Sequence, residues 1–116
     1  AQAHAQLQAQ IASYLGPEAE VEMLDEAVAV WSEPDAAWMR SVFAAAGGVT
    51  GETPRIETAP YFTDASALTP AYGGIPTVIL GPGPAHMAHQ TDEYCEVKRI
   101  EEAVAISERV IDGWKG

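Results

Sequence analysis

The sequence predicts an α/β fold built on an open mixed sheet, and three patterns support this prediction. The run "IPTVILGPG", residues 75–83, is apolar and rich in β-branched residues, which is typical of a central strand covered on both faces. From residue 35 onward, segments with the periodicity of helices and of strands alternate along the chain. Near the N-terminus, Val21 and Met23 alternate with glutamates, which is the period of a half-buried strand.

Residues 1–33 form the first predicted unit, one helix and one strand of a small α+β layer. An amphipathic helix is expected over residues 3–15, because apolar side chains recur at helical spacing there before Gly16 and Pro17 end the pattern. These apolar side chains are Leu7, Ile11, Tyr14 and Leu15. The alternating residues 20–23 predict the strand, and residues 24–34 are interpreted as an extended connection.

Residues 34–116 form the second predicted unit, which begins with a helix over residues 36–46. Asp35 is its expected N-cap, and the pair Gly47-Gly48 is its expected end. The segment "TPRIETAPY" then predicts a short strand. The segment "TDASALTPAYGG" predicts a short helix that is capped by Thr63 or Asp64 and broken at Pro70.

The central strand at residues 75–82 is followed by a turn and then by a last helix that begins near Lys98. The apolar residues near helical spacing in that helix, which predict its buried face, are Ile100, Val104, Ile111 and Trp114. In open α/β sheets, sites form beyond the carboxyl ends of the strands. The turn of residues 81–94 follows the most apolar strand, so we expect its side chains to lie at that edge.

The charge of the chain excludes some classes of partner. Seventeen acidic residues against six basic ones give a formal net charge of −11, which repels phosphate backbones and anionic lipid. No apolar run approaches the roughly 20 residues that a spanning helix needs. Cys95 is the only cysteine and has no internal disulfide partner, which fits a reducing compartment. We therefore expect a cytoplasmic protein with no nucleic-acid or membrane partner.

The turn after the central strand contains two of the three histidines. His86 and His89 are spaced H-x-x-H and are followed by Asp92 and Glu93. Neutral imidazole is a good zinc ligand, and a nearby carboxylate can orient the ring by accepting its second N–H. A metal ligand at His89 is one interpretation of this turn, and an ordinary surface histidine is the other. His4, in the first helix, is interpreted as structural.

Residues 60–116 resemble the C-terminal end of the zinc-dependent amidohydrolases that include acetylornithine deacetylase, succinyl-diaminopimelate desuccinylase, aminoacylase and carboxypeptidase G. The motifs that carry the resemblance are a Thr-Asp loop, Gly-Ile-Pro before an apolar strand, Gly-Pro-Gly, and Ala-His-x-x-Asp-Glu-Tyr before a last amphipathic helix. The resemblance implies that residues 34–116 are the C-terminal part of a zinc-exopeptidase-like catalytic domain. It implies that residues 1–33 are the end of a lid domain that mediates dimerisation.

The resemblance also implies roles for individual residues. His89 falls on a histidine that binds one of two zinc ions, whereas His86 matches no ligand of the family. Glu93 and Asp92 would hold the loop or hydrogen-bond to the ligand, and Thr63 would line the substrate pocket. The implied activity is hydrolysis of the amide bond of an N-acyl amino acid or short peptide by a homodimer.

The sequence departs from this family in lacking several of its functional residues, including the lid histidine that reaches across the dimer in many members. The His-x-Asp motif, the bridging Asp and the Glu-Glu pair that supplies the general base are not found in these residues. The chain alone is therefore expected to be inactive, with no catalytic residue of its own, and to depend on the remainder of the catalytic domain. Two alternatives stay open: a small interaction module without catalytic activity, and a metal carrier in which His86 and His89 bind one ion together.

Overall fold

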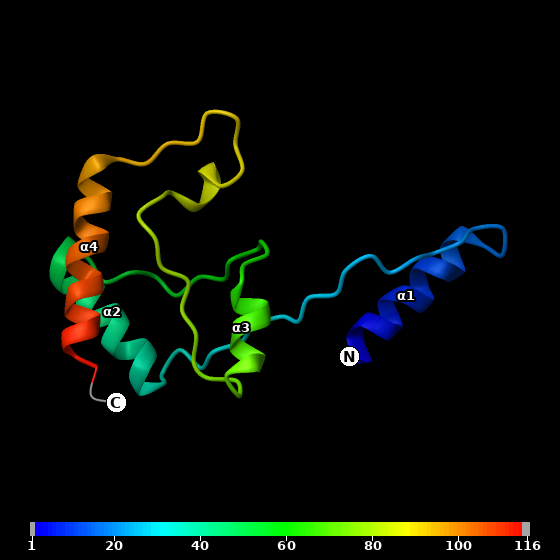
Figure 1. Ribbon diagram of the computed structural model, residues 1–116, viewed down its shortest axis with the longest axis horizontal. Coiled ribbons are helices and arrows are strands. Elements are labelled where there is room, and N and C mark those ends of the chain that lie inside the picture. Colours follow the sequence, from blue (N-terminus) through cyan, green and yellow to red (C-terminus); the bar gives the residue numbers. More distant parts are fainter. Residues whose placement is uncertain (1, 115–116) are drawn as a thin grey trace.

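Helices are the regular elements of the computed structural model, which describes residues 2–114. In chain order these elements are α1 (Gln2–Leu15), α2 (Ala37–Thr50), α3 (Ala65–Ala71), the short 3₁₀ helix η1 (Ala85–Met87) and α4 (Val97–Asp112). Figure 1 shows α2 and α4 side by side at one end of the molecule and α1 at the other end. Long irregular segments connect them, and α3 lies between the two ends.

The prediction of an open mixed α/β sheet is wrong, because no strand occurs in residues 2–114. All three predicted strands are irregular chain in the structure. A strand exists only where its backbone groups pair with a neighbour, and proline lacks the N–H group that this pairing requires. Two prolines interrupt each of the two longer runs, Pro54 and Pro60 in the first and Pro76 and Pro82 in the second. The apolar composition therefore predicted strands for segments that lack a backbone partner.

The helix pair α2 and α4 contains most of the buried core. On α2, Met39, Val42 and Ala46 are buried, and Val42 is only 2% exposed. On α4, the buried residue is Ile106, at 6% exposure. Trp38, near the start of α2, packs edge to face against Trp114 with a ring-centroid distance of 5.2 Å. The contact between the two tryptophans joins the start of α2 to the chain just after the end of α4.

The predicted buried face of α4 is wrong. The four side chains that predicted it are exposed by 46–70% of their surface, and they are Ile100, Val104, Ile111 and Trp114. Helix α4 has a second apolar stripe around Ile106, and this stripe faces α2. Residues 100, 104 and 111 lie within about 40° of one another around the helix, whereas residue 106 lies on the other side. When a helix has two apolar stripes, its sequence does not show which of them packs against a single neighbouring helix.

Helix α2 is longer than the sequence predicts, since it continues through Gly47 and Gly48 and ends at Thr50. Gly48 allows the guanidinium group of Arg109 to approach the helix: a Cβ atom there would lie 2.5 Å from Nη1 of that side chain. The true C-cap is Gly51, whose φ of 82° is in the left-handed region and whose N–H donates to the Gly47 carbonyl at 2.9 Å. The predicted cap at Asp35 is also wrong, because the N-cap residue is Ala36 and no side chain caps this end.

Replacing Gly51 with alanine is expected to lower the free energy of unfolding by about 1 kcal/mol, because a Cβ atom disfavours the left-handed conformation. The matched control is Gly48→Ala, which removes a glycine from the helix interior and displaces only the flexible end of Arg109. That change is expected to be neutral or to stabilise by up to about 1 kcal/mol. Urea unfolding followed by circular dichroism measures both variants. Equal losses in the two variants would contradict the assignment of the cap.

Helix α1 agrees with the predicted helix over residues 3–15, and the chain then folds back alongside it (Figure 1). The imidazole Nδ1 of His4 pairs with the carboxylate of Glu26, which joins the start of α1 to the returning segment. Apolar side chains of this N-terminal unit remain exposed, with Tyr14 at 92% and Leu24 at 86%. The pair of His4 and Glu26 is a side-chain contact between the helix and the returning segment.

The hydrogen bond from His4, together with the charge of its ring, lowers the pKa of Glu26 below its ordinary value. A lowered pKa means that the pairing stabilises the fold above the ordinary glutamate pKa of about 4.3, and that this stabilisation is lost as the pH falls through the lowered pKa. In His4→Ala, the pKa of Glu26 is expected to rise toward its ordinary value. An NMR titration of the Glu26 side chain measures this change, and His86→Ala is the control in which it should not move. A Glu26 pKa that is the same with and without His4 would show that the pair does not form.

The molecule is open for its size. Its radius of gyration is 18.5 Å, whereas a compact domain of this length has a radius of about 13 Å. Its accessible surface is 9429 Å², against about 6100 Å² for a typical folded monomer of this mass. Each helix within residues 2–114 is too short or too polar to cross a lipid bilayer. The division into units 1–33 and 34–116 stays a prediction.

Candidate functional site

The histidine turn is formed by a short 3₁₀ helix that starts after a proline. Pro84 is extended, and its carbonyl accepts the N–H of Met87 at 2.9 Å. The Met87 carbonyl then accepts the N–H of Gln90 at 3.1 Å. Between these two residues the chain turns sharply at His89. The local hydrogen bonds therefore determine the direction of the backbone on both sides of this histidine.

His89 is the only non-glycine residue within residues 2–114 that has a positive φ, at 63°. A side chain with a Cβ atom rarely adopts this left-handed conformation, and such residues concentrate at functional sites. Four glycines precede it in the connection after α3, at positions 73, 74, 81 and 83, yet the left-handed position itself is occupied by histidine. The backbone therefore marks His89 independently of the sequence motif.

The other predicted residues of the turn lie on the same exposed loop. His86 lies in η1, and His86, His89, Asp92 and Glu93 are all exposed. Within residues 2–114, no three side chains of His, Cys, Asp or Glu converge on a position for a metal ion. An exposed imidazole on a rigid turn fits the role of one zinc ligand, but the usual structural or catalytic site has three or four protein ligands. The described residues therefore fit one position of a metal site and do not form a complete ligand set.

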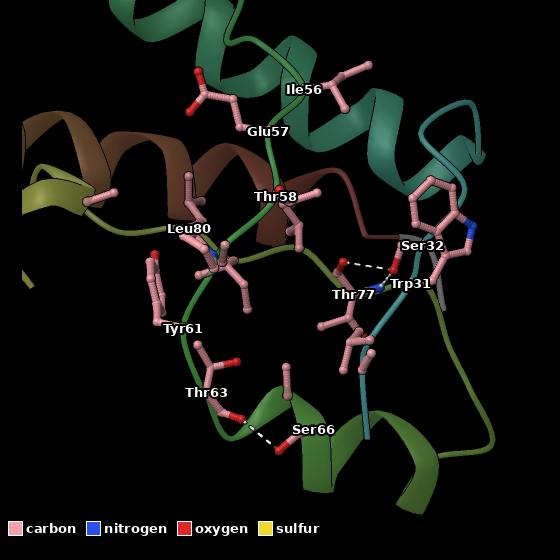
Figure 2. A pocket seen from close by; sticks show the side chains of 18 of the residues that line it. Trp31, Ser32, Ile56, Glu57, Thr58, Tyr61, Thr63, Ser66, Thr77 and Leu80 are labelled. Atoms are coloured by element: carbon pink, nitrogen blue, oxygen red, sulfur yellow. Dashed lines mark hydrogen bonds between the residues drawn. The ribbon is translucent and has the colours of Figure 1, made fainter. Parts of the chain in front are cut away.

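Thr63 lies on the wall of a cavity of about 870 Å³, shown in Figure 2. Its backbone carbonyl accepts two hydrogen bonds from Ser66, one from the N–H at 3.1 Å and one from the hydroxyl at 3.0 Å. These bonds begin α3 and hold Thr63 at the cavity. Asp64 occupies the N-cap position of α3, as predicted, but its side chain makes no capping bond, and its carbonyl accepts the N–H of Leu68 at 2.8 Å.

The cavity lies between α2, α3 and the irregular segments that were predicted to form the sheet. Apolar side chains such as Val42, Phe43 and Leu80 line it, together with several hydroxyl-bearing side chains. The wall also includes Gly81, Gly83 and Ala85, the residues that lead into the histidine turn. Thr63 and the start of the histidine turn therefore share one cavity, while His89 lies further along the chain on the exposed loop.

Five hydroxyl-bearing residues of the cavity wall were not predicted from the sequence, and they are Ser32, Thr58, Tyr61, Ser66 and Thr77. Tyr61 lies two positions before Thr63, so its presence beside the Thr-Asp loop was a usable signal. Ser32 and Thr58 lie in segments without any motif, and their place at the cavity follows only from the path of the chain.

Most of the chain matches one family. Residues 3–113 match the sequence profile of peptidase family M20/M25/M40. No curated protein and no solved structure matches the chain. The profile match places the chain among the hydrolases of peptidase type. More narrowly, the chain belongs to peptidase family M20/M25/M40, whose members are generally metal-dependent, with zinc as the usual metal.

Proposed function

We propose that the protein containing this chain is a zinc-dependent hydrolase that cleaves the amide bond of N-acyl amino acids or short peptides. The observation that carries the proposal is the family match over residues 3–113. The left-handed backbone of His89 adds support, because it coincides with the histidine that the motif assigns to the metal. The substrate class rests on the resemblance of the Thr-Asp and Ala-His-x-x-Asp-Glu-Tyr segments to the amidohydrolases.

In this proposal, His89 would be a ligand of one zinc ion, and Asp92 or Glu93 would support its imidazole. When bound, the zinc ions would supply a water of lowered pKa and polarise the amide carbonyl of the substrate. Thr63 presents its hydroxyl on the cavity wall, where it orients the substrate. The remaining zinc ligands and the general base come from the remainder of the catalytic domain, so the chain alone is inactive.

The proposal extends to the assembly and its location. The protein is a cytoplasmic homodimer, and the net charge of −11 on these 116 residues disfavours nucleic acid and anionic membranes as partners. Sedimentation of the full protein at several concentrations tests the dimer. A single species with the mass of one chain would contradict it.

Metal analysis and activity assays of the full protein test the proposed function. We expect about two zinc ions per chain and hydrolysis of at least one member of a panel of N-acetyl amino acids, N-succinyl amino acids and dipeptides. A chelator is expected to remove the activity, and added zinc should restore it. A protein that binds no metal and hydrolyses none of these substrates would contradict the proposal and favour an interaction module.

A further inference from the structure

The hydroxyl group of Ser32 bonds to both backbone groups of Thr77, a residue 45 positions away in the sequence (Figure 2). The N–H of Thr77 donates to Ser32 Oγ at 2.7 Å, and the same hydroxyl donates to the Thr77 carbonyl at 2.9 Å. Two residues that face each other in an antiparallel sheet exchange two such bonds through their backbones. Here one side chain provides both.

The two partners of this contact are held differently. The hydroxyl of Thr77 donates its hydrogen to the Ile75 carbonyl at 3.0 Å. In the second hydrogen bond of this hydroxyl, at 2.8 Å, Thr69 Oγ1 is therefore the donor and Thr77 Oγ1 the acceptor. Thr69 is buried in α3 at 8% exposure. Thr77 is therefore fixed to α3 through its own side chain.

Ser32 has no comparable support. Within residues 2–114, the two bonds of Ser32 are the only hydrogen bonds that join the connection of residues 24–34 to any residue after position 36. A rotation about one side-chain torsion breaks both bonds together, whereas a backbone ladder opens only when the strand itself moves. The contact is partly buried, so its breaking exposes the Thr77 amide to solvent.

We propose that the contact between Ser32 and Thr77 is a releasable clasp between the connection and the segment of residues 75–80. When the hydroxyl rotates away, the connection and the N-terminal unit separate from this segment while α2 and α4 stay folded. This inference concerns the motion of the chain and does not depend on the proposed hydrolase activity.

Hydrogen exchange at the Thr77 amide tests the clasp in the full protein. Ser32→Ala is expected to speed exchange at Thr77 by roughly tenfold, the effect of losing about one net hydrogen bond. Ser32→Thr keeps the hydroxyl and should restore slow exchange. The control is Ser41→Ala, which removes a hydroxyl that bonds only within α2, to the Trp38 carbonyl at 2.7 Å. Exchange at the Val42 amide, in the buried part of α2, should not change in any variant.

Two results would overturn the clasp. One is an exchange rate at Thr77 that is the same with and without the Ser32 hydroxyl. The other is equal acceleration at Thr77 and Val42, because this would mean that the contact opens only when the helix pair unfolds. A distance measurement between spin labels checks the separation directly, with Ala12→Cys and Ala44→Cys as label sites in a Cys95→Ser background. Ser32→Ala is expected to broaden the distance distribution between them, and an unchanged distribution would also overturn the clasp.

Discussion

Replacing His89 with alanine is expected to lower the zinc affinity of the full protein by more than about 100-fold and to remove most of its amide hydrolysis. The loss exceeds the 10–100-fold effect of removing a residue that only supports a ligand, because the imidazole itself binds the metal in our proposal. Zinc content after dialysis and the rate of N-acyl amino acid hydrolysis measure the two effects. A His89→Ala protein that keeps both its zinc and its activity would remove His89 from the metal site.

Two further variants separate the possible causes of this loss. His89→Asn tests the backbone, because asparagine adopts the left-handed conformation more readily than most residues and yet lacks the imidazole. It should fold like the parent protein and still lose zinc. His86→Ala tests the neighbouring histidine, which lies in the same turn and is also exposed. Zinc affinity and activity should stay within about twofold of the parent values. A collapse of zinc affinity in this variant would favour a site in which both histidines bind one ion.

Replacing Ile106 with alanine is expected to lower the free energy of unfolding by about 2–4 kcal/mol, the usual cost of a cavity left by a buried isoleucine. Ile106 is 6% exposed and is the buried side chain that α4 places against α2. Since buried side chains are few in this molecule, we expect the helix pair to lose much of its cooperativity as well. Urea unfolding of the 116-residue chain, followed by circular dichroism, measures the loss.

The matched control is Ile111→Ala, which is the same chemical change on the same helix. Ile111 is 70% exposed, so the change is expected to alter stability by no more than about 0.5 kcal/mol. Comparable losses in the two variants would mean that both apolar stripes of α4 are covered in solution. A larger loss at Ile111 would mean that the stripe predicted from the sequence is the buried one after all.

The helices were predictable from the sequence, and their packing was not. Periodicity and the breakers Gly16 and Pro17 predicted α1 correctly, and the amphipathic pattern after residue 96 predicted α4. The end of α2 was missed because glycines 47 and 48 read as a stop signal. In the structure, Gly48 makes room for Arg109, a contact between residues 61 positions apart. A local pattern contains no information about such a contact.

The sheet was the largest error, and its cause is also non-local. The run at residues 75–83 has the composition of a central strand, but a strand forms only when another backbone lies alongside it. In the structure, the side chain of Ser32 bonds to the backbone groups of Thr77 that a neighbouring strand would use. Composition shows which segments are apolar, and it does not predict which backbone each segment meets.

The candidate site was predictable only in part. His89 and Thr63 were both named from motifs, and the roles of these residues and of Asp92 and Glu93 stay predictions. The left-handed φ of His89 adds a feature that no motif contains. The cavity beside Thr63 depends on the meeting of α2, α3 and two irregular segments, so its wall could not be derived from any one stretch of sequence.

The large accessible surface of the folded chain also determines how the chain responds to denaturant. Because 9429 Å² is already exposed to solvent, unfolding adds about 30% less new surface than it would for a compact monomer of the same mass. The steepness of a urea transition and the heat-capacity increment of unfolding both scale with that added surface. The 116-residue chain should therefore unfold over a broad range of urea concentration and have a shallow temperature dependence of stability. The N-terminal unit, which is joined through few contacts, should melt before the pair formed by α2 and α4.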